Sequence, residues 1–360
     1  MHNKKNILIA TGGTGGHIYP AIVTAEELRR RGWTVKFIGR FGSAVDKLSA
    51  RNFAYRNITA QGFVSRGPWQ VFLALICLIK SCFVCLGEVW RSDVAVVLGF
   101  GGYSSFPAVF IGWALGRKTM IHEQNVCPGL ANRILGRFVR KVAVSFNDSQ
   151  SSFARSKVVC TGYPMRPLGA GRPRAQVLKA FGLEAGRKTV LIFGGSQGSQ
   201  AINQAVLSCL EALGKDAPLQ VIHLAGQGRA EGLRPRYEAL PFPFYLRDYS
   251  EGMSDAYAAA DLVICRSGAG TVTELGLLGL PAILIPYPFA NSHQEANARV
   301  LVRHNAAVII REKDLNPALL GDKIFSVLQA PRSREVVLQA LSKDIAFDAV
   351  VRLADEVERL

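Results

Sequence analysis

Short apolar runs and amphipathic stretches alternate along both halves of the chain. Apolar runs bounded by glycine, proline or charged residues predict buried strands, and the amphipathic stretches between them predict helices. The expected strands are Asn6–Ala10, Val35–Gly39, Val94–Leu98, Thr119–His122, Val142–Val144, Val158–Cys160, Val190–Phe193, Val221–Ala225, Leu262–Cys265, Ala282–Ile285 and Ala307–Ile310. This alternation predicts parallel sheets with helices on both faces, and therefore an α/β fold.

Two glycine-rich turns follow expected strands about half a chain apart. The first reads Thr-Gly-Gly-Thr-Gly-Gly-His over Thr11–His17, and the second reads Gly-Gly-Ser-Gln-Gly-Ser over Gly194–Ser199. A helix is expected after each turn, the first near Pro20–Arg31. Backbone N–H groups and the helix dipole at such a junction favour a bound phosphate. Two such turns predict two Rossmann-like lobes with a cleft between them, and a cleft of this kind can hold a phosphorylated donor and a separate acceptor.

These turns differ from two common phosphate-binding motifs. Neither matches the dinucleotide fingerprint, and no Lys-Ser/Thr pair follows the glycines, which argues against an ATPase. No Asp-X-Asp motif follows an expected strand, and the pair Cys82 and Cys85 has no second Cys/His pair nearby. We therefore expect no cofactor and no metal ligand in the protein.

A turn-rich stretch rich in proline and arginine begins at Pro164 and predicts the link between two domains. The expected domains are residues 1–163 and residues 164–345. The remaining residues, 346–360, contain an expected helix over Asp348–Leu360. We expect this helix to pack back on the N-terminal domain.

The net charge of +16 over 360 residues calls for an anionic partner. Nucleic acid, an anionic membrane surface and a phosphorylated substrate all meet that need. The basic residues are dispersed, and no recognised nucleic-acid motif is present. The pattern therefore favours a membrane surface over nucleic acid, with a merely soluble basic surface as the alternative.

One strongly apolar segment raises the question of whether the protein spans or contacts a membrane. The run Val71–Leu86 is interrupted by Lys80 and is shorter than the roughly 20 residues that span a bilayer, so we expect that it does not cross one. It lies in an expected helix over Gln70–Trp90. Two interpretations stay open: a buried helix, or a helix whose exposed face enters a membrane surface, with Trp69 and Trp90 at its ends.

The cysteine count and the N-terminus point to one compartment. Seven cysteines are an odd number spread over expected strands and helices, which argues for a reducing compartment and against a disulfide framework. The first residues lead directly into a strand and lack the apolar core of a signal peptide. A reducing compartment without a secretory signal peptide is therefore expected.

A third segment of small residues follows the strand that ends at Cys265. Residues 267–271 form a turn, a helix is expected to open near Thr271, and the junction is another anion cradle. Glu274, expected in the first turn of that helix, either caps the turn or accepts hydrogen bonds from ribose hydroxyls. Gln294 begins the next expected helix and offers both a donor and an acceptor to sugar hydroxyls.

Four motifs follow one another along the chain in an order that resembles a known protein family. Gly-Gly-Thr-Gly-Gly-His, His-Glu-Gln-Asn, Gly-Gly-Ser-Gln-Gly and Cys-Arg-Ser-Gly-Ala follow one another as in the MurG family, which this chain resembles over nearly its whole length. These bacterial glycosyltransferases add N-acetylglucosamine to lipid I, the undecaprenyl-pyrophosphoryl-N-acetylmuramyl peptide. The resemblance implies a two-lobed fold of the glycosyltransferase B type. It also implies an N-terminal domain that faces the acceptor and the membrane, and a C-terminal domain that binds UDP-N-acetylglucosamine.

The resemblance also implies a set of substrate-binding residues. They are Thr14, Gly15, Gly16, Asn125, Arg166, Ser196, Ser250, Ala269, Gly270, Thr271, Val272, Thr273, Glu274 and Gln294. Arg166 matches an arginine at the lobe junction, Ser196 a hydroxyl that faces the diphosphate, and Glu274 a ribose ligand. The chain departs from the family pattern at Tyr163, where many relatives have Asn, and at His293 and Ser250.

The implied reaction is an inverting transfer that makes lipid II for peptidoglycan synthesis on the cytoplasmic face of the cell membrane, to which the enzyme binds peripherally. His17 is the candidate general base, because imidazole titrates near working pH; the alternative is a histidine that only caps the loop. Arg166, Ser196 and backbone amides near Thr271 would meet the charge of the leaving UDP. Two other functions stay open: an enzyme similar to UDP-N-acetylglucosamine 2-epimerase, and a non-catalytic nucleotide-sugar-binding subunit.

Overall fold

The computed structural model describes residues 5–12, 15–60, 68–166, 172–195, 197–214, 217–250, 252–289, 293–330, 334–342 and 344–360. The chain divides into two compact units. Unit 1 comprises Met1–Arg166 together with Asp344–Leu360, and unit 2 comprises Pro167–Lys343. The expected domain boundaries lie at 163/164 and 345/346.

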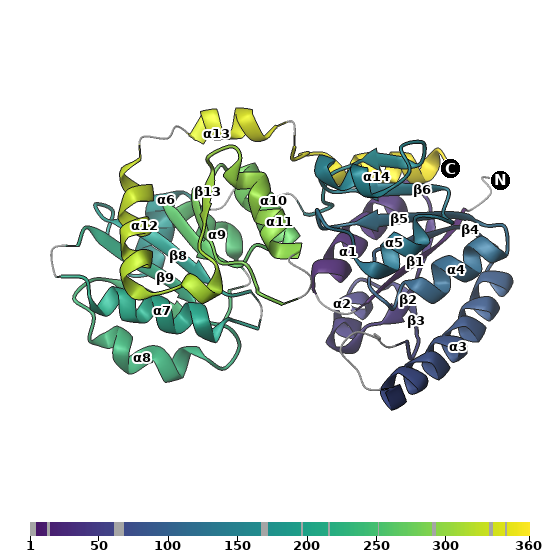
Figure 1. Ribbon diagram of the computed structural model, residues 1–360, viewed down its shortest axis with the longest axis horizontal. Helices are drawn as coiled ribbons and strands as arrows, with labels where there is room; N and C mark the ends of the chain where they lie inside the picture. The colour runs from purple at the N-terminus through teal and green to yellow at the C-terminus, as the bar shows by residue number, and fades with distance from the viewer. Residues whose placement is uncertain are drawn as a thin grey trace. The chain divides into compact units, whose positions relative to one another are not determined.

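Unit 1 is built on a sheet of seven parallel strands in the order β3-β2-β1-β4-β5-β6-β7. Its strands are β1 (Asn6–Gly12), β2 (Thr34–Arg40), β3 (Ala54–Asn57), β4 (Val94–Gly99), β5 (Lys118–Glu123), β6 (Lys141–Val144) and β7 (Val158–Cys160). Its helices are α1 (Gly15–Arg30), α2 (Val45–Ser49), α3 (Pro68–Arg91), α4 (Phe106–Ala114), α5 (Leu130–Leu135) and α14 (Ala349–Glu358) (Figure 1). The strand order reverses between β1 and β4, which is where ligands bind in such sheets.

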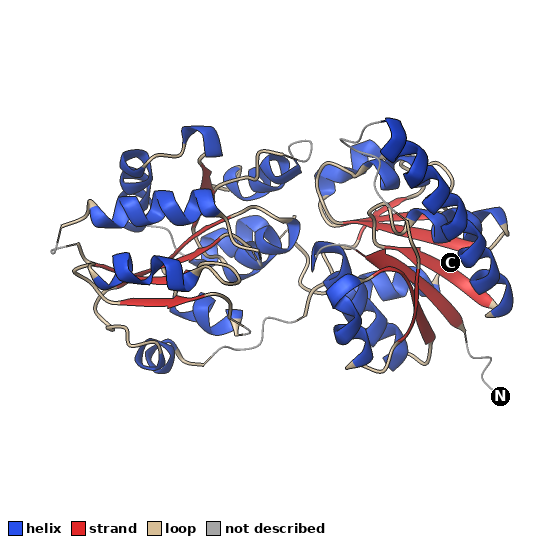
Figure 2. Cartoon of the chain, turned by 90° about the horizontal axis from the view of Figure 1, so that it is seen from below, coloured by secondary structure: helices blue, strands red, loops and turns tan. Residues whose placement is uncertain are grey.

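Unit 2 repeats this design with six parallel strands in the order β10-β9-β8-β11-β12-β13. Its strands are β8 (Lys188–Phe193), β9 (Leu219–Leu224), β10 (Phe244–Arg247), β11 (Leu262–Cys265), β12 (Ala282–Leu284) and β13 (Ala307–Ile309). Its helices are α6 (Arg174–Ala180), α7 (Gln200–Glu211), α8 (Ala230–Glu238), α9 (Met253–Ala259), α10 (Ala269–Leu278), α11 (His293–Val302), α12 (Pro317–Gln329) and α13 (Arg334–Leu341). Figure 2 shows the helices on both faces of each sheet.

The prediction of two parallel-sheet α/β domains is confirmed, and every expected strand is present. Two further strands, β3 and β10, were not expected from the sequence. Each is the outermost strand at one end of its sheet. Every residue of β3 is exposed, so it lacks the apolar run that marks a buried parallel strand.

Three features of the helices differ from the sequence expectations. α1 begins at Gly15 rather than near Pro20, so that Pro20 lies inside the helix. Proline has no N–H to give to the carbonyl four residues earlier, that of Gly16. The Tyr163 hydroxyl donates to this carbonyl instead, at 3.3 Å, which is how the helix accommodates the proline. α10 begins at Ala269, so Glu274 lies in the second turn rather than the first.

The third difference concerns α3. This helix has 24 residues. By length and composition its part Phe72–Arg91 could cross a membrane, and about 22% of its most apolar stretch is buried inside the protein. The expectation that the apolar segment is too short to span a bilayer is therefore wrong, because the helix continues past Leu86 to Arg91. Length alone does not decide between a span and a surface helix, so the packing of α3 has to decide it.

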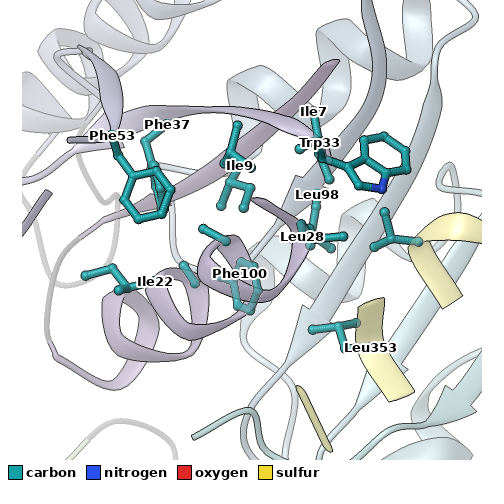
Figure 3. Close-up of a cluster of buried hydrophobic side chains, with 14 of the residues drawn as sticks. Ile7, Ile9, Ile22, Leu28, Trp33, Phe37, Phe53, Leu98, Phe100 and Leu353 are labelled. Carbon is teal, nitrogen blue, oxygen red and sulfur yellow. The ribbon is translucent and has the colours of Figure 1, made fainter. Parts of the chain in front are cut away.

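The core of unit 1 draws in the end of the chain. Leu353, Ala354 and Val357 of α14 belong to the buried cluster that contains Ile7, Leu28 and other residues of β1 and α1 (Figure 3). Polar contacts reinforce the packing, since the Arg31 guanidinium bonds to Asp355 at 2.7 Å and to Glu358 at 2.8 Å. The C-terminal helix is thus part of unit 1, although more than 170 residues of unit 2 precede it in the chain.

Candidate active site

A histidine stands at the switch point of unit 1. His17 is the third residue of α1, and its ring lies against the glycine loop that follows β4. A Cβ atom at Gly101 would lie 3.5 Å from Cε1 of His17, and one at Gly102 would lie 3.6 Å from its Cδ2. Both glycines have positive φ, +79° and +72°, which side chains rarely adopt. The loop therefore presents bare backbone to the imidazole.

A chain of hydrogen bonds leads from His17 into the protein. Its Nδ1 lies 3.0 Å from Oε1 of Gln124, whose Nε2 lies 3.2 Å from Nδ1 of His122. Nε2 of His122 lies 3.0 Å from the carbonyl oxygen of Gly162. His122 is fully buried, and the loss of solvation lowers its pKa to about 4. It is therefore neutral at physiological pH.

A buried carboxylate shapes the loop that carries Asn125. Glu123 accepts hydrogen bonds from the backbone N–H groups of Asn125 at 2.9 Å and Gly129 at 3.1 Å, and from the side chain of Asn132 at 2.9 Å. The Asn125 carbonyl accepts a bond from Ser149 at 3.0 Å. The position of Asn125 is thus set from both sides of its backbone.

The other expected residues of unit 1 occupy different settings. Gly15 and Gly16 open α1 and are exposed, while Thr14 lies outside the described residues. Arg166 is exposed and its guanidinium pairs with Glu26 at 3.2 Å. This places Arg166 beside α1, with its charge already facing a carboxylate.

In unit 2 the start of α10 is an open helix N-terminus. Gly268 precedes the helix, no side chain caps it, and its first turn holds no acid. The Val272 N–H makes the first intrahelical bond, to Gly268, so the amides of Ala269, Gly270 and Thr271 have no partner within the helix. Such amides and the helix dipole favour an anion. The side chains of Val272 and Thr273 are buried, and Thr273 bonds back to the Ala269 carbonyl at 2.9 Å.

Glu274 lies one turn further along α10 and has a partner that the sequence did not reveal. Its Oε2 accepts a hydrogen bond from the Tyr257 hydroxyl of α9 at 2.7 Å. Burial raises the pKa of Glu274 above its ordinary value, and the bond from Tyr257 opposes that rise. Tyr257 is itself buried. One carboxylate oxygen of Glu274 therefore joins α9 and α10.

Gln294 and Ser250 both make local bonds. Oε1 of Gln294 accepts from the backbone N–H groups of Ser267 at 3.2 Å and Tyr287 at 3.0 Å. Ser250 accepts the Gly252 N–H at 3.2 Å, a bond that shapes its own turn.

The second glycine turn leads into α7, and described contacts hold its C-terminal end. Ser196 lies outside the described residues. Ser199 caps α7 by accepting the Ile202 N–H at 3.4 Å, and it also accepts a bond from Arg266 at 2.7 Å. A Cβ atom at Gly198, where φ is +70°, would lie 2.2 Å from the Ala225 carbonyl oxygen, so only glycine fits. Within the described ranges, no group of three or more His, Cys, Asp or Glu side chains is arranged to hold a metal ion.

Sequence reasoning missed residues that support the candidate site. His122 and Gln124 belong to the His-Glu-Gln-Asn motif, of which only Asn125 was expected at the site. Tyr163 and Tyr257 were also missed, because each contacts a residue far from it in the chain. Besides the motif, a signal in the sequence was position, since His122 and Gln124 lie at the carboxyl end of an expected strand.

Comparison with known proteins identifies the family. The glycosyltransferase family 28 N-terminal domain matches residues 7–144, and the family 28 C-terminal domain matches residues 189–351. The UDP-N-acetylglucosamine–N-acetylmuramyl-(pentapeptide) pyrophosphoryl-undecaprenol N-acetylglucosamine transferase of Desulforamulus reducens is 37% identical over 97% of this chain and 98% of that protein. The protein of the same name from Syntrophus aciditrophicus is 39% identical over 90% of each.

A solved structure agrees with these relatives. The crystal structure of MurG from Acinetobacter baumannii matches 99% of this chain and 100% of that chain, with a TM-score of 0.78 and 27% identity. The expected glycosyltransferase B type of fold and the resemblance found in the sequence are both confirmed, and neither an epimerase nor a non-catalytic subunit is supported. The chain belongs to the MurG family of family 28 glycosyltransferases.

Proposed function

We propose that this glycosyltransferase transfers N-acetylglucosamine from UDP-N-acetylglucosamine to the muramyl sugar of undecaprenyl-pyrophosphoryl-N-acetylmuramyl-pentapeptide, which makes lipid II for peptidoglycan synthesis. The relatives quoted above are named for a transfer between these substrates. The observation that carries the proposal for this chain is the pair of switch-point sites. Unit 1 presents an imidazole, and unit 2 presents an open helix N-terminus.

The two sites supply complementary chemistry. Nε2 of His17 takes the proton from the muramyl hydroxyl as its oxygen attacks the anomeric carbon. The bond from that carbon to the UDP oxygen breaks on the opposite face, so an α-linked donor gives a β-linked product. The bonding electrons leave with UDP, whose diphosphate gains negative charge. Amides of Ala269, Gly270 and Thr271 stabilise that charge together with Ser196 and Arg166.

The remaining expected residues bind the substrates in this proposal. The carboxylate of Glu274 accepts from ribose hydroxyls, and the amide nitrogen of Gln294 donates to the sugar. Ser250 lies by the uracil. Gly15, Gly16 and Asn125 line the site of unit 1, and Thr14, outside the described residues, is a further substrate-binding residue in this proposal. Backbone rather than side-chain contacts are available at Val272 and Thr273, whose side chains are buried.

We further propose that α3 binds the membrane surface without crossing it. One face of α3, including Ala74, Ser81, Cys85 and Val89, is buried, and the helix packs against α4. The opposite face carries a stripe of exposed apolar side chains: Trp69, Phe72, Leu73, Ile79, Phe83, Leu86 and Trp90. A helix that is buried along one side and apolar along the other suits an interface, whereas a span would leave its packed face without its partners.

The distribution of charge supports the same surface. Unit 1 carries 24 of the 43 Lys and Arg residues of the chain but only 12 of its 27 Asp and Glu residues. Most of the net charge of +16 therefore belongs to the unit that contains α3. Lys80 lies on α3 itself, and Arg140 lies in the same unit. An anionic membrane, such as the cytoplasmic leaflet, is the partner that we propose for this charge, and nucleic acid is not.

The transfer itself is tested by a radiolabelled assay. Purified protein is incubated with labelled UDP-N-acetylglucosamine and lipid I, and the products are separated into lipid and aqueous phases. We expect label in the lipid phase as a β-linked disaccharide, together with equimolar UDP. Release of N-acetylmannosamine without lipid acceptor, or nucleotide-sugar binding without any turnover, would reject the proposal.

Membrane binding is tested by sedimentation with vesicles that contain anionic lipid. Each basic residue near such a surface contributes about 1 kcal/mol, which salt screens, so binding should weaken steeply with ionic strength. Phe83→Glu should remove the binding that remains at high salt and leave UDP affinity intact. Phe347→Glu is the matched control, because Phe347 is 71% exposed and Phe83 is 70% exposed. Equal effects of the two variants, or binding that resists both salt and alkaline carbonate, would contradict a peripheral α3.

A further inference from the structure

The hydrogen bonds behind His17 determine which of its ring nitrogens is available. We propose that Gln124 and His122 are positioning residues that hold His17 in the tautomer with the proton on Nδ1 and the lone pair on Nε2. This inference rests on the proposed function, in which Nε2 of His17 takes the proton of the acceptor hydroxyl. The assignment follows from the direction of each bond, starting at the buried end.

The first bond is fixed by a backbone carbonyl. The Gly162 oxygen accepts only, so Nε2 of His122, 3.0 Å away, carries the proton that it donates. His122 is neutral, because burial lowers its pKa to about 4. A neutral imidazole has one N–H, so Nδ1 of His122 carries a lone pair.

The second step fixes the orientation of the Gln124 amide. One end of this amide lies 3.2 Å from Nδ1 of His122 and 3.2 Å from the backbone oxygen of His122. Both of these atoms are acceptors, so the amide nitrogen must face them. The amide oxygen then points to His17. Since this oxygen accepts only, Nδ1 of His17 at 3.0 Å must donate to it.

The third step concerns the open end of the chain of bonds. With its proton on Nδ1, neutral His17 carries its lone pair on Nε2. No hydrogen bond to this nitrogen is found among the described residues, and the bare loop of Gly101 and Gly102 faces the ring edge. A proton acceptor is therefore held ready at the carboxyl edge of the sheet. The opposite tautomer would put two acceptors, Nδ1 of His17 and Oε1 of Gln124, against each other.

The buried end of the chain of bonds depends on the C-terminal segment. Gly162 has φ of +86°, and a Cβ atom there would lie 2.8 Å from that of Ala346 and 2.9 Å from that of Ala349. The segment around α14 thus packs directly on the residue whose carbonyl fixes His122. Two titratable groups of the described residues lie near His122. His17 lies at the far end of Gln124, and the Glu123 carboxylate accepts hydrogen bonds from Asn125, Gly129 and Asn132.

The tautomer is measured directly by nitrogen-15 NMR of histidine-labelled full-length protein. The chain has 6 histidines, and the His17→Ala spectrum assigns the signals of His17 by their loss. We expect a protonated Nδ1 and an unprotonated Nε2 in the wild-type protein. In Gln124→Met the signal should change to a mixture of tautomers. A wild-type spectrum with the proton on Nε2 would overturn the inference, whatever the transfer assay shows.

Kinetics test whether the positioning matters for turnover. Gln124→Met removes the three hydrogen bonds of the amide to His17 and His122 at similar side-chain volume. A misoriented catalytic group costs about 10²-fold, so kcat should fall by about that factor while KM for the sugar donor stays within about twofold. Gln124→Glu keeps an acceptor for Nδ1 of His17 and adds negative charge. It should retain more turnover than Gln124→Met, and the acid limb of its pH–rate profile should move to higher pH.

Gln220→Met is the matched control for the loss of a buried amide. Gln220 is as buried as Gln124 and also makes several internal bonds, to Glu184 and Thr189 in unit 2. It should lower stability and leave kcat unchanged. A folded Gln124→Met enzyme with the kcat of Gln220→Met would show that Gln124 only supports the fold. Failure of transfer in the wild-type enzyme, with the expected NMR tautomer, would instead count against the proposed function.

Discussion

His122 in unit 1 and His223 in unit 2 are both fully buried near the carboxyl ends of interior strands, β5 and β9, and both bond to a side-chain amide. In unit 2, Nδ2 of Asn203 donates to the Ala225 carbonyl at 2.9 Å, so its oxygen accepts from Nε2 of His223 at 3.1 Å. Nδ1 of His223 then accepts from the Tyr237 hydroxyl at 2.6 Å. Every polar group of His223 is satisfied within unit 2.

The two networks differ in where they end. The network of His223 closes on itself in the core, which satisfies buried polar groups and adds nothing at the surface of the sheet. The network of His122 continues through Gln124 to His17 and ends on a half-buried imidazole. A buried histidine bonded to a side-chain amide thus supports packing in unit 2 and, in our proposal, helps to present a base in unit 1. Burial of a histidine by itself does not distinguish the two roles; the end of its hydrogen-bond chain does.

The largest expected effect comes from removing the open end of the unit 1 network. His17→Ala should lower kcat by roughly 10²–10⁴-fold if His17 is the general base. UDP binding should be unchanged, because the donor contacts are proposed mainly for unit 2. Steady-state kinetics over a range of pH, with calorimetry for UDP, measure both. Near wild-type turnover at every pH would leave His17 with a purely structural role, like that of His223 in β9.

A smaller effect is expected at Glu274, which serves both packing and binding in our proposal. Glu274→Ala removes charge-assisted hydrogen bonds, each worth roughly 1.5–3 kcal/mol, so UDP affinity should fall about tenfold or more. Tyr257→Phe is the control, because it removes the internal bond and keeps the carboxylate. It should lower stability and change UDP affinity far less. If calorimetry shows equal losses for the two variants, Glu274 acts through helix packing and not through ribose.

Acid should destabilise both units through their buried histidines. Burial lowers the pKa of His122 to about 4 and that of His223 to about 3, against 6.5 in an unfolded chain. Between pH 6.5 and these values the unfolded state binds more protons, so the free energy of unfolding falls as pH falls. Hydrogen exchange resolved by strand measures each unit. His223→Asn should weaken the pH dependence of the free energy of unfolding in unit 2 alone. If this pH dependence weakens in both units, the two units unfold as one.

The smallest effect is expected at two carboxylates that each pair with two arginines. Glu27 bonds to Arg30 and Arg31 in unit 1, and Glu295 bonds to Arg299 and Arg311 in unit 2, which lowers the pKa of each carboxyl to about 2. Their contribution is present above pH 4.5 and is lost as pH falls towards 2. Glu27→Gln and Glu295→Gln should each cost about 1 kcal/mol or less at neutral pH, by urea denaturation. A much larger loss for Glu27→Gln would show that the Arg31 contacts to α14 depend on it.

Much of this protein follows from local sequence. Apolar runs marked every buried strand near its place, and the glycine turns after β1 and β8 marked both switch points. The four motifs in order identified the family. These features are local or ordered along the chain, so their signal survives without knowledge of the fold. The edge strand β3 left no such signal, because exposed strands need no apolar run.

Tertiary structure alone decided the contacts that give these residues their roles. His17 and Gln124 are 107 positions apart, and Tyr163 replaces the missing N–H of Pro20 from 147 positions away, at Gly16. Periodicity reports which face of an element is buried, but not which partner covers it. The tautomer of His17, the second partner of Glu274 and the packing of α14 on unit 1 all depend on such distant pairings. Hydrogen-bond direction is set by the atoms that meet in space, and only the folded chain brings those atoms together.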